Sequence, residues 1–452
     1  MATHTSRQLN LIDGPILKTL ARLAAPIMAT AFLSTAYNLT DAFWVGQLGA
    51  DAVAGVGTGG MYLWLSGGLT VLARTGGQVY TAQAIGAGDR HLARGYSLAS
   101  IRLALLLGLL YGALCALLPA QLLSFFRLND ALTFRYAKEY LRITGGCIVF
   151  SFLTQVMTGL FTARGDSKTP FICNVAGLVV NMILDPLLIL GFGPFPRLEA
   201  VGAAVATVTA QLLVLVLMLL HRRQILRDGT NEAARSGTPY TRNILRLSLP
   251  HAVQATLYCG FSMILARMIA SFGDDAVAVQ RIGGQIEAIS WNVSDGFAAS
   301  LNAFTAQNLG AGKKDRYRRG YYYSSALLFA WGLLIALLFF FGAGQIAGLF
   351  FHESGACAIM VSYLTIISIC EPFMCIEILT VGALSALEKT RLSSIISITL
   401  TGTRIPLALF LTGSGFGIPS FWWALTLSSV AKGIVFFTAY TLLTRTKKAD
   451  RP

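Results

Sequence analysis

The stretch Ala200–Leu220, which reads AVGAAVATVTAQLLVLVLMLL, contains no charged residue. It is long enough to cross a bilayer as one helix, since a crossing takes about 20 apolar residues. Similar blocks recur along the 452-residue chain, in which 55% of residues are hydrophobic and 12% are charged. Globular proteins contain about 25% charged residues. One water-soluble core cannot bury this much apolar surface, so the sequence predicts an all-α polytopic membrane protein.

Division of the apolar blocks at Gly, Pro and charged residues predicts twelve transmembrane helices. The predicted spans are 17–42, 52–84, 95–118, 134–163, 170–194, 200–221, 243–271, 276–308, 320–342, 358–386, 391–412 and 419–444.

The net charge of +14 is explained by membrane topology and requires no nucleic acid. Of the 35 Lys and Arg residues, 24 lie in one alternate set of loops, whereas the other set contains only Arg127, Arg135, Lys138 and Arg197. Cytoplasmic loops retain positive charge, so we expect a multi-pass membrane protein with both termini in the cytoplasm.

Several motifs of other protein classes are missing from the sequence. Met1–Asp13 lacks the charged start, apolar centre and cleavage site of a secretory signal, so we expect the first span to be retained. The seven cysteines show no CxxC or Cys/His spacing, and we expect neither disulfides nor a metal site. No phosphate-binding loop or nucleophile motif suggests an enzyme or a cofactor.

An internal repeat indicates that the chain is built from two homologous six-helix bundles. A shift of 224 residues aligns long stretches, and 14 of the 40 positions from Gly49 to Gly88 are identical. Related shifts of 223 and 220 align Tyr140 with Tyr363 and Asp185-Pro186 with Ile405-Pro406. We therefore expect an N-terminal lobe (1–221), a cytoplasmic linker (222–242) and a C-terminal lobe (243–452). An even number of spans per copy places the pseudo-twofold axis along the membrane normal.

Two acids in the apolar spans, Asp41 and Asp185, are expensive to bury in a membrane and are therefore candidates for function. Tyr37 and Ser34 lie four and seven residues before Asp41, so the three share one helical face. In the fifth span, Asn181 lies four residues before Asp185, and Asn174 lies seven before Asn181.

The repeat shows that neither acid is needed to build a bundle. Asp41 aligns with Leu265 and Asp185 with Ile405, so the second copy lacks both acids. Two interpretations remain. Either each acid is a buried partner of an arginine, with Arg74, Arg281 and Arg404 as candidates, or the two acids form a protonatable or cation-binding site in the N-terminal lobe.

The physics of such a site favours protonation. A carboxyl group in a low-dielectric cavity resists ionisation, and a second carboxylate nearby strengthens this effect, so the two acids would titrate as a pair. Tyr37 and Asn181 can change their hydrogen bonds as the acids gain or lose a proton. Proton binding can then favour one helix arrangement over another.

Other side chains are weaker candidates for a substrate cavity, in which Met and aromatic groups provide soft contacts and stacking. The candidates are Ser34, Asn38, Asn174, Met157, Phe161, Met182, Glu287, Trp291 and Glu377. For Glu287 and Glu377 the alternative is an ion pair with Arg281 or Arg267. Pro26 leaves a helix carbonyl unbonded and is a candidate hinge, although Pro250 at the aligned position allows a shared packing role.

The residues resemble those of the multidrug and toxic compound extrusion (MATE) transporters along essentially the whole chain. The segments that carry this resemblance are NLTDAFWVGQLG (38–49), AQAIGAGD (82–89), TARGDSKTP (162–170), NMILDPLLI (181–189) and GAAVAT (202–207). The resemblance implies twelve helices in two lobes, alternating access, and efflux of lipophilic, often cationic drugs driven by inward flow of H+ or Na+. No cofactor is expected, and we expect a monomer.

The acids of the N-terminal lobe look like those of the DinF-like branch. This likeness implies coupling roles for Tyr37, Asp41, Asn181, Asp185 and Thr207. Other branches carry acids in the seventh and tenth spans, whereas this chain has none in its seventh span and has Met374 at the aligned position of the tenth. We therefore expect a drug/H+ antiporter of the cell (inner) membrane, coupled in the N-terminal lobe. The alternatives are Na+ coupling, or a lipid-linked precursor flippase of the same superfamily.

Overall fold

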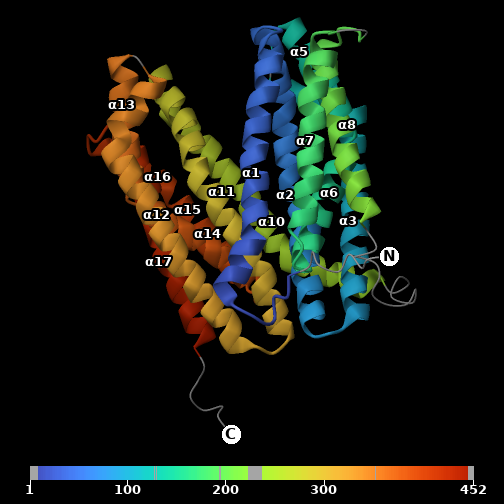
Figure 1. Cartoon of the computed structure of the whole chain (residues 1–452). Helices are drawn as coiled ribbons and strands as arrows, with labels where there is room; N and C mark the ends of the chain where they lie inside the picture. The colour runs from blue at the N-terminus through green and yellow to red at the C-terminus, as the bar shows by residue number, and fades with distance from the viewer. Residues whose placement is uncertain are drawn as a thin grey trace. The chain divides into compact units, whose positions relative to one another are not determined.

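The computed structural model describes residues 9–126, 128, 130–192, 195–221, 237–351 and 353–445. Within these ranges the chain is helical and contains no β-strand (Figure 1). Most of the predicted linker, 222–236, lies outside the described residues, as do Arg127, residues 1–8 and residues 446–452.

The helices form two compact units, divided inside α10 between Ala252 and Val253. Unit 1 consists of 22–252 with 9–14 and 310–312, and unit 2 of 253–309 and 313–445 with 15–21. The helices of unit 1 are α1 (Ile16–Gly46, from Arg22 onward), α2 (Ala50–Gly86), α3 (Arg90–Leu117), α4 (Pro119–Ser124), α5 (Ala131–Tyr140), the π-helix η1 (Leu141–Gly145), α6 (Val149–Ala163), α7 (Lys168–Ile189) and α8 (Glu199–Leu220).

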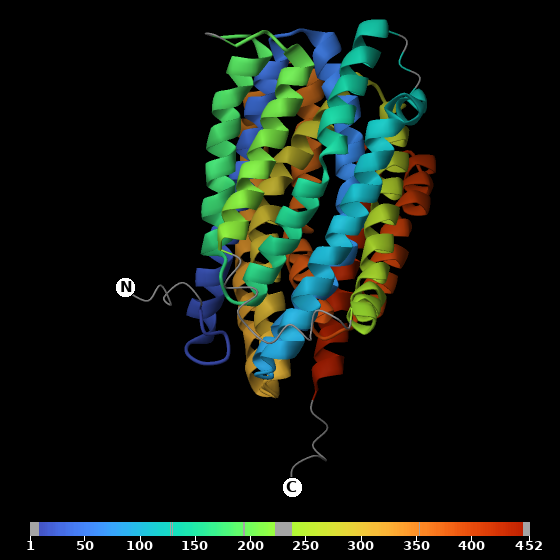
Figure 2. The same ribbon diagram turned by 90° about the vertical axis from the view of Figure 1, so that its right-hand side faces the viewer.

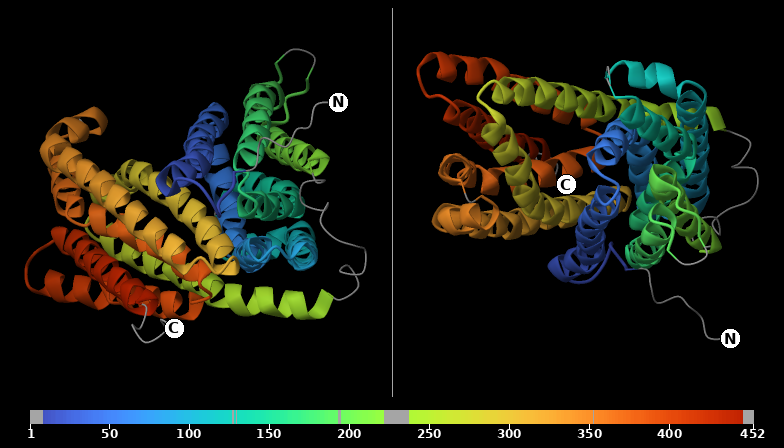
Figure 3. Two further views of the ribbon diagram at one scale, coloured as in Figure 1. Left: turned by 60° about the horizontal axis from the view of Figure 1, so that its bottom comes forward. Right: turned by 90° about the horizontal axis from the view of Figure 1, so that it is seen from above.

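The second unit begins within α10 (Gly237–Ala270). It continues with α11 (Asp274–Gly310), α12 (Lys314–Phe350), α13 (Ser354–Ser368), α14 (Glu371–Ala386), α15 (Thr390–Gly402), α16 (Arg404–Gly413) and α17 (Pro419–Thr444). In unit 1, α7 packs along α8 and α2 along α3 (Figures 1 and 2). In unit 2, α12 packs against α13 and α14, and α14 packs against α17 (Figure 3).

Eight helices of the described chain are long and apolar enough to cross a membrane, or ten if each of two bent pairs counts as one span. One pair bends by 47° between Ala131–Gly145 and Val149–Ala163, and the other by 55° between Ser354–Ser368 and Glu371–Ala386. Helices α2 and α11, each 37 residues long, complete the set. The predicted twelve-helix, two-lobe fold is confirmed.

The sequence repeat is also visible in the backbone. Gly49 precedes α2 and the aligned Gly273 precedes α11, and both residues have φ of 108°. Gly88 and Gly312, which follow the same two helices, have φ of 77° and 71°. This region of φ is costly for residues with a Cβ but not for glycine. The repeated glycines therefore give both long helices the same start and the same end.

Two glycines allow α7 and α8 to approach closely. A Cβ atom at Gly177 would lie 2.2 Å from Cγ2 of Val214, and one at Gly202 would lie 2.3 Å from the carbonyl oxygen of Leu188. Small residues permit such backbone proximity between membrane helices. The close approach fixes the register of two helices that carry polar residues of the cavity described below.

Replacement of Gly202 by Ala should destabilise unit 1. The added Cβ meets rigid backbone of α7, and overpacking of this kind costs about 1–3 kcal/mol. We expect a lower midpoint of thermal unfolding in detergent, followed by intrinsic fluorescence. The matched control is Gly67→Ala in α2, where the new Cβ has no atom within 4 Å outside its chain neighbours and the nearby backbone of its own helix. Equal midpoints for both variants would contradict the packing role of Gly202.

Candidate functional site

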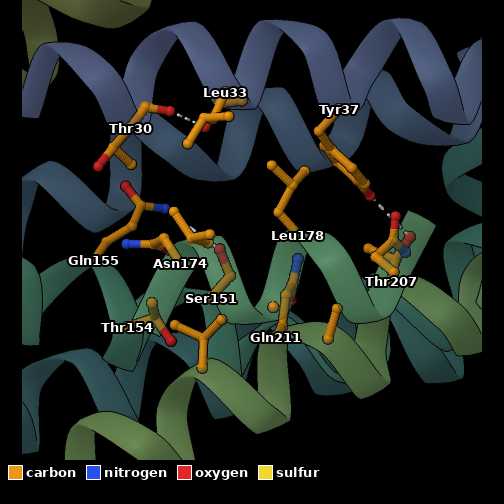
Figure 4. A pocket seen from close by; sticks show the side chains of 16 residues that line it. Thr30, Leu33, Tyr37, Ser151, Thr154, Gln155, Asn174, Leu178, Thr207 and Gln211 are labelled. Carbon is orange, nitrogen blue, oxygen red and sulfur yellow. Dashed lines mark hydrogen bonds between the residues drawn. The ribbon is translucent and has the colours of Figure 1, made fainter. Parts of the chain in front are cut away.

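Helices α1, α6, α7 and α8 of unit 1 enclose a cavity of about 250 Å³ (Figure 4). Its walls are mixed, with hydroxyl and amide side chains between aliphatic ones. The lining residues are Thr30, Leu33, Ser34, Tyr37, Ser151, Thr154, Gln155, Asn174, Val175, Gly177, Leu178, Asn181, Thr207, Ala210, Gln211 and Val214. None of them is basic, and none is an acid.

The polar groups of the wall recur at helical spacings of three, four or seven residues, so each helix turns one polar face to the cavity. Several of these groups bond to their own helix. Thr30 donates to the Pro26 carbonyl and Ser34 to the Thr30 carbonyl, both at 2.9 Å, and Asn174 donates to the Pro170 carbonyl at 2.8 Å. Hydroxyls that bond back to the preceding turn are already satisfied. They provide a weakly polar surface for a ligand.

At one end of the cavity a hydrogen bond joins two distant helices. The hydroxyl oxygens of Tyr37 on α1 and Thr207 on α8 lie 3.2 Å apart, and either can donate (Figure 4). Tyr140, which is 6% exposed, also interacts with Thr207. It lies within electrostatic range of Asp41 and Asp185. Tyr37 and Thr207 line the cavity, and both tyrosines lie within electrostatic range of the two acids.

The two acids lie in the same part of unit 1 and interact electrostatically. Asp185 is fully buried and Asn181 is 1% exposed, and the Asn181 amide donates to Oδ1 of Asp185 at 3.3 Å. Three buried oxygens nearby have no hydrogen-bond partner: Oδ1 of Asp41, Oδ2 of Asp185 and Oδ1 of Asn181. Within the described residues neither acid forms an ion pair with an arginine.

The unpartnered atoms show that the site lacks hydrogen-bond donors. All three are acceptors, and buried acceptors without a donor are costly. A proton on one carboxyl group supplies a donor and removes a buried charge, and a bound cation would serve the same oxygens. In the described part of the chain, no group of three His, Cys, Asp or Glu residues could hold a metal ion.

The predicted cavity residues of unit 1 divide into two groups. Ser34 and Asn174 line the cavity together with Tyr37, Asn181 and Thr207. Asn38 and Met182 are exposed, the latter by 39%, whereas Met157 and Phe161 are buried in the apolar core of the unit. The structure therefore does not bring these four to the cavity.

The predicted candidates of unit 2 have other surroundings. Glu287 accepts a hydrogen bond from Tyr363. Glu377 forms a buried ion pair with Lys432 at 2.8 Å, and not with Arg281 or Arg267. Trp291 is partly buried, and its indole nitrogen has no hydrogen-bond partner.

Sequence reasoning missed Tyr140, Gln155 and Gln211. The four-residue spacing that marks Tyr37 and Asp41 also relates Ser151 to Gln155 and Thr207 to Gln211. The same test applied to these spans would have identified both glutamines. Tyr140 carried a different signal, because it aligns with a tyrosine in the other copy.

Comparisons with known proteins agree with this fold. A family model described as MatE matches residues 26–187 and 250–410, two segments that begin 224 residues apart. The probable multidrug resistance protein NorM of Thermotoga maritima is 27% identical over 403 residues, which cover 87% of this chain and 85% of the relative. A FAD transporter of Shewanella oneidensis is 24% identical over 432 residues, which cover 94% and 95%.

Solved structures share the architecture over nearly the whole chain. A crystal structure of MATE in the bent conformation superposes with a TM-score of 0.89 at 22% identity and covers 96% of both chains. An outward-facing multidrug resistance MATE family transporter of the MOP superfamily gives 0.88 at 22% identity, with 98% and 99% covered. At this identity the likeness establishes the fold.

The hydrogen bond between Tyr37 and Thr207 should contribute to the stability of unit 1. We expect a double-mutant cycle of Tyr37→Phe and Thr207→Val to give a coupling energy of about 0.5–1.5 kcal/mol in the free energy of unfolding, measured by dodecyl sulfate titration. Tyr37→Phe combined with Thr30→Val is the control, because Thr30 bonds only to its own helix. Additive effects in both cycles would refute the contact.

Proposed function

We propose, from the premise that this chain belongs to the MATE family of membrane transporters, that it exports lipophilic, often cationic compounds in exchange for H+. Family membership makes the chain a transporter rather than an enzyme. Relatives named as multidrug resistance proteins support a role in efflux. The observation that carries proton coupling is the set of three buried, donorless oxygens on Asp41, Asp185 and Asn181.

The arrangement favours exchange of a cation for a proton. The cavity has no basic lining residue, and Tyr37, Asn181 and Thr207 on its wall adjoin the acids. An ionised acid attracts a cationic substrate, whereas its protonation removes that attraction. Proton and substrate therefore weaken each other's binding, which is the coupling that an antiporter requires.

The same features argue against an anionic compound in this cavity. A relative from Shewanella oneidensis is named a FAD transporter, and FAD carries phosphates. Recognition of phosphate relies on Arg, Lys or free backbone N–H groups. The cavity of unit 1 presents no Arg or Lys side chain.

Pro26 is a candidate point of bending in α1, close to the cavity. It lies inside α1 and cannot donate a backbone hydrogen bond to the carbonyl of Arg22, which favours a bend at this point. Thr30 bonds to the Pro26 carbonyl and also lines the cavity. We assign the hinge of α1 to this turn.

Na+ is the second candidate ion. Carboxylate, amide and hydroxyl oxygens are the ligands that hard cations prefer, and the unpartnered atoms are all oxygens. The positively charged loops support an orientation with both termini in the cytoplasm. The proposal also places the chain in the inner membrane of the cell, in the DinF-like branch of the family, and as a monomer.

Asp41→Asn should abolish the drug resistance that the chain confers on a sensitive host while leaving its membrane expression intact. The amide keeps the size of the side chain but cannot exchange a proton. Asp51→Asn is the matched control, because Asp51 is an exposed acid in the first turn of α2. Full resistance in Asp41→Asn would rule out this coupling site.

The coupling ion can be identified in proteoliposomes that contain a fluorescent cationic dye. We expect a pH gradient alone to drive dye movement and Asp41→Asn or Asp185→Asn to reduce it to the level of protein-free vesicles. Dye movement that requires a Na+ gradient would replace H+ by Na+. Absence of movement under both gradients would refute drug antiport.

A further inference from the structure

Unit 2 contains a second pair of buried acids that is distinct from Asp41 and Asp185. Glu371, the first residue of α14, is 0% exposed, and Glu287 on α11 is 5% exposed. The two carboxyl groups are close enough to interact electrostatically. Glu287 accepts a hydrogen bond from the hydroxyl of Tyr363 on α13.

Close packing holds these groups in place. Gly283 lies one turn before Glu287, and a Cβ atom there would lie 2.3 Å from the ring of Tyr363. The glycine therefore makes room for the ring that reaches Glu287. Gly332 of α12 packs against the first turn of α14, where a Cβ would lie 2.5 Å from Cα of Pro372. These contacts enclose Glu371 in the interior of the unit.

Glu371 forms no ion pair within the described residues. Both of its carboxyl oxygens are buried and lack a hydrogen bond of ordinary geometry, although the Ser290 hydroxyl lies nearby. Arg404 lies within electrostatic range of Glu287 and donates to Ser428 at 2.7 Å and to Ser429 at 2.9 Å. Lys432 is matched by Glu377. The titratable groups around the two acids are Tyr258, Tyr363, Cys370, Cys375, Glu377, Arg404 and Lys432.

The balance of charges leaves one acid uncompensated. Arg404 interacts with Glu287 and Lys432 pairs with Glu377, and among the described residues no Lys or Arg forms an ion pair with Glu371. The N-terminus of α14 contributes a partial charge of about +0.5, less than one full counter-charge. A buried, unpaired carboxylate is very costly, and a neutral carboxylic acid is much less so. A proton held by the two acids would therefore remove the uncompensated charge.

The internal repeat separates these acids from the scaffold that holds them. At shifts of 224 and 223, Glu287 aligns with Leu63 and Glu371 with Ile148, so the first copy is built without either acid. The tyrosine and glycine are shared, because Tyr140 packs against Gly59 with a Cβ-to-ring distance of 3.1 Å. Both copies therefore share a Tyr–Gly contact, and the two acids occur beside it only in the second copy.

We propose that Glu287 and Glu371 form a second proton-binding site, in the C-terminal lobe, where the pair holds one proton. The site gives the transporter a titratable group that does not depend on Asp41 or Asp185. No step of the exchange proposed for unit 1 passes through it.

Infrared spectroscopy of the purified protein in detergent tests this site without transport. Protonated carboxyl groups absorb at a C=O frequency where carboxylates do not, and incorporation of 13C-labelled glutamate shifts only the Glu bands. At pH 7, in Na+-free buffer, we expect a label-sensitive band equivalent to roughly one protonated Glu. It should disappear in Glu371→Gln and persist in the matched control Glu377→Gln, whose acid is paired with Lys432.

The labelled wild type is informative even if Glu371→Gln does not fold. Absence of a label-sensitive band at pH 7 would overturn the proposal, as would its survival in Glu371→Gln or its loss in Glu377→Gln. Loss of the band on addition of Na+ would assign the pair to a metal cation instead. Retention of the band in the Asp41→Asn/Asp185→Asn double variant is also expected, so failure of the unit 1 site and failure of this one are separate outcomes.

Discussion

A carboxylate inside a helix bundle has no bulk water to solvate it, so each buried acid needs a cation, a hydrogen-bond donor or a proton. The acids of this chain meet that requirement to different degrees. Glu377 has Lys432, and Glu287 has the hydroxyl of Tyr363. Asp185 has a donor at one oxygen only, and Glu371 has only the nearby hydroxyl of Ser290. The unmet requirement, rather than acidity itself, distinguishes the candidate proton sites from the structural ones.

The two units share one helical framework, but the side chains at corresponding positions inside it differ. A small cavity of about 30 Å³ in unit 2 is lined by Gln254, Tyr258, Phe261, Glu377, Ser397, Ile398, Thr401 and Lys432. Three of these align with Thr30, Ser34 and Tyr37 at a shift of 224, and Thr401 aligns with Asn181 at 220. Larger side chains and an ion pair fill the copy in unit 2, whereas Thr30 and Ser34 leave the unit 1 cavity open to a ligand.

The sequence predicted the helices and the repeat well because both depend on long patterns. The same apolar runs predicted the spans 52–84 and 276–308, which correspond to α2 and α11. Neither bend was predicted, since bending depends on packing such as that of Gly332 against Pro372. Helical spacing placed Tyr37 beside Asp41, but the hydroxyl bonds to Thr207 on another helix. Spacing defines a face, whereas the partner depends on tertiary packing.

Asn181 connects a buried acid to the wall of the cavity. Its amide donates to Asp185, its Oδ1 is unpartnered, and the residue lines the cavity. In the exchange proposed above, an ionised Asp185 would hold the NH2 group of Asn181 and leave the amide oxygen as an acceptor. A protonated Asp185 can donate to that oxygen, and the amide then turns its NH2 group outward. Under that proposal one proton would convert this part of the wall from acceptor to donor, which would disfavour a cation in the cavity while the proton is bound.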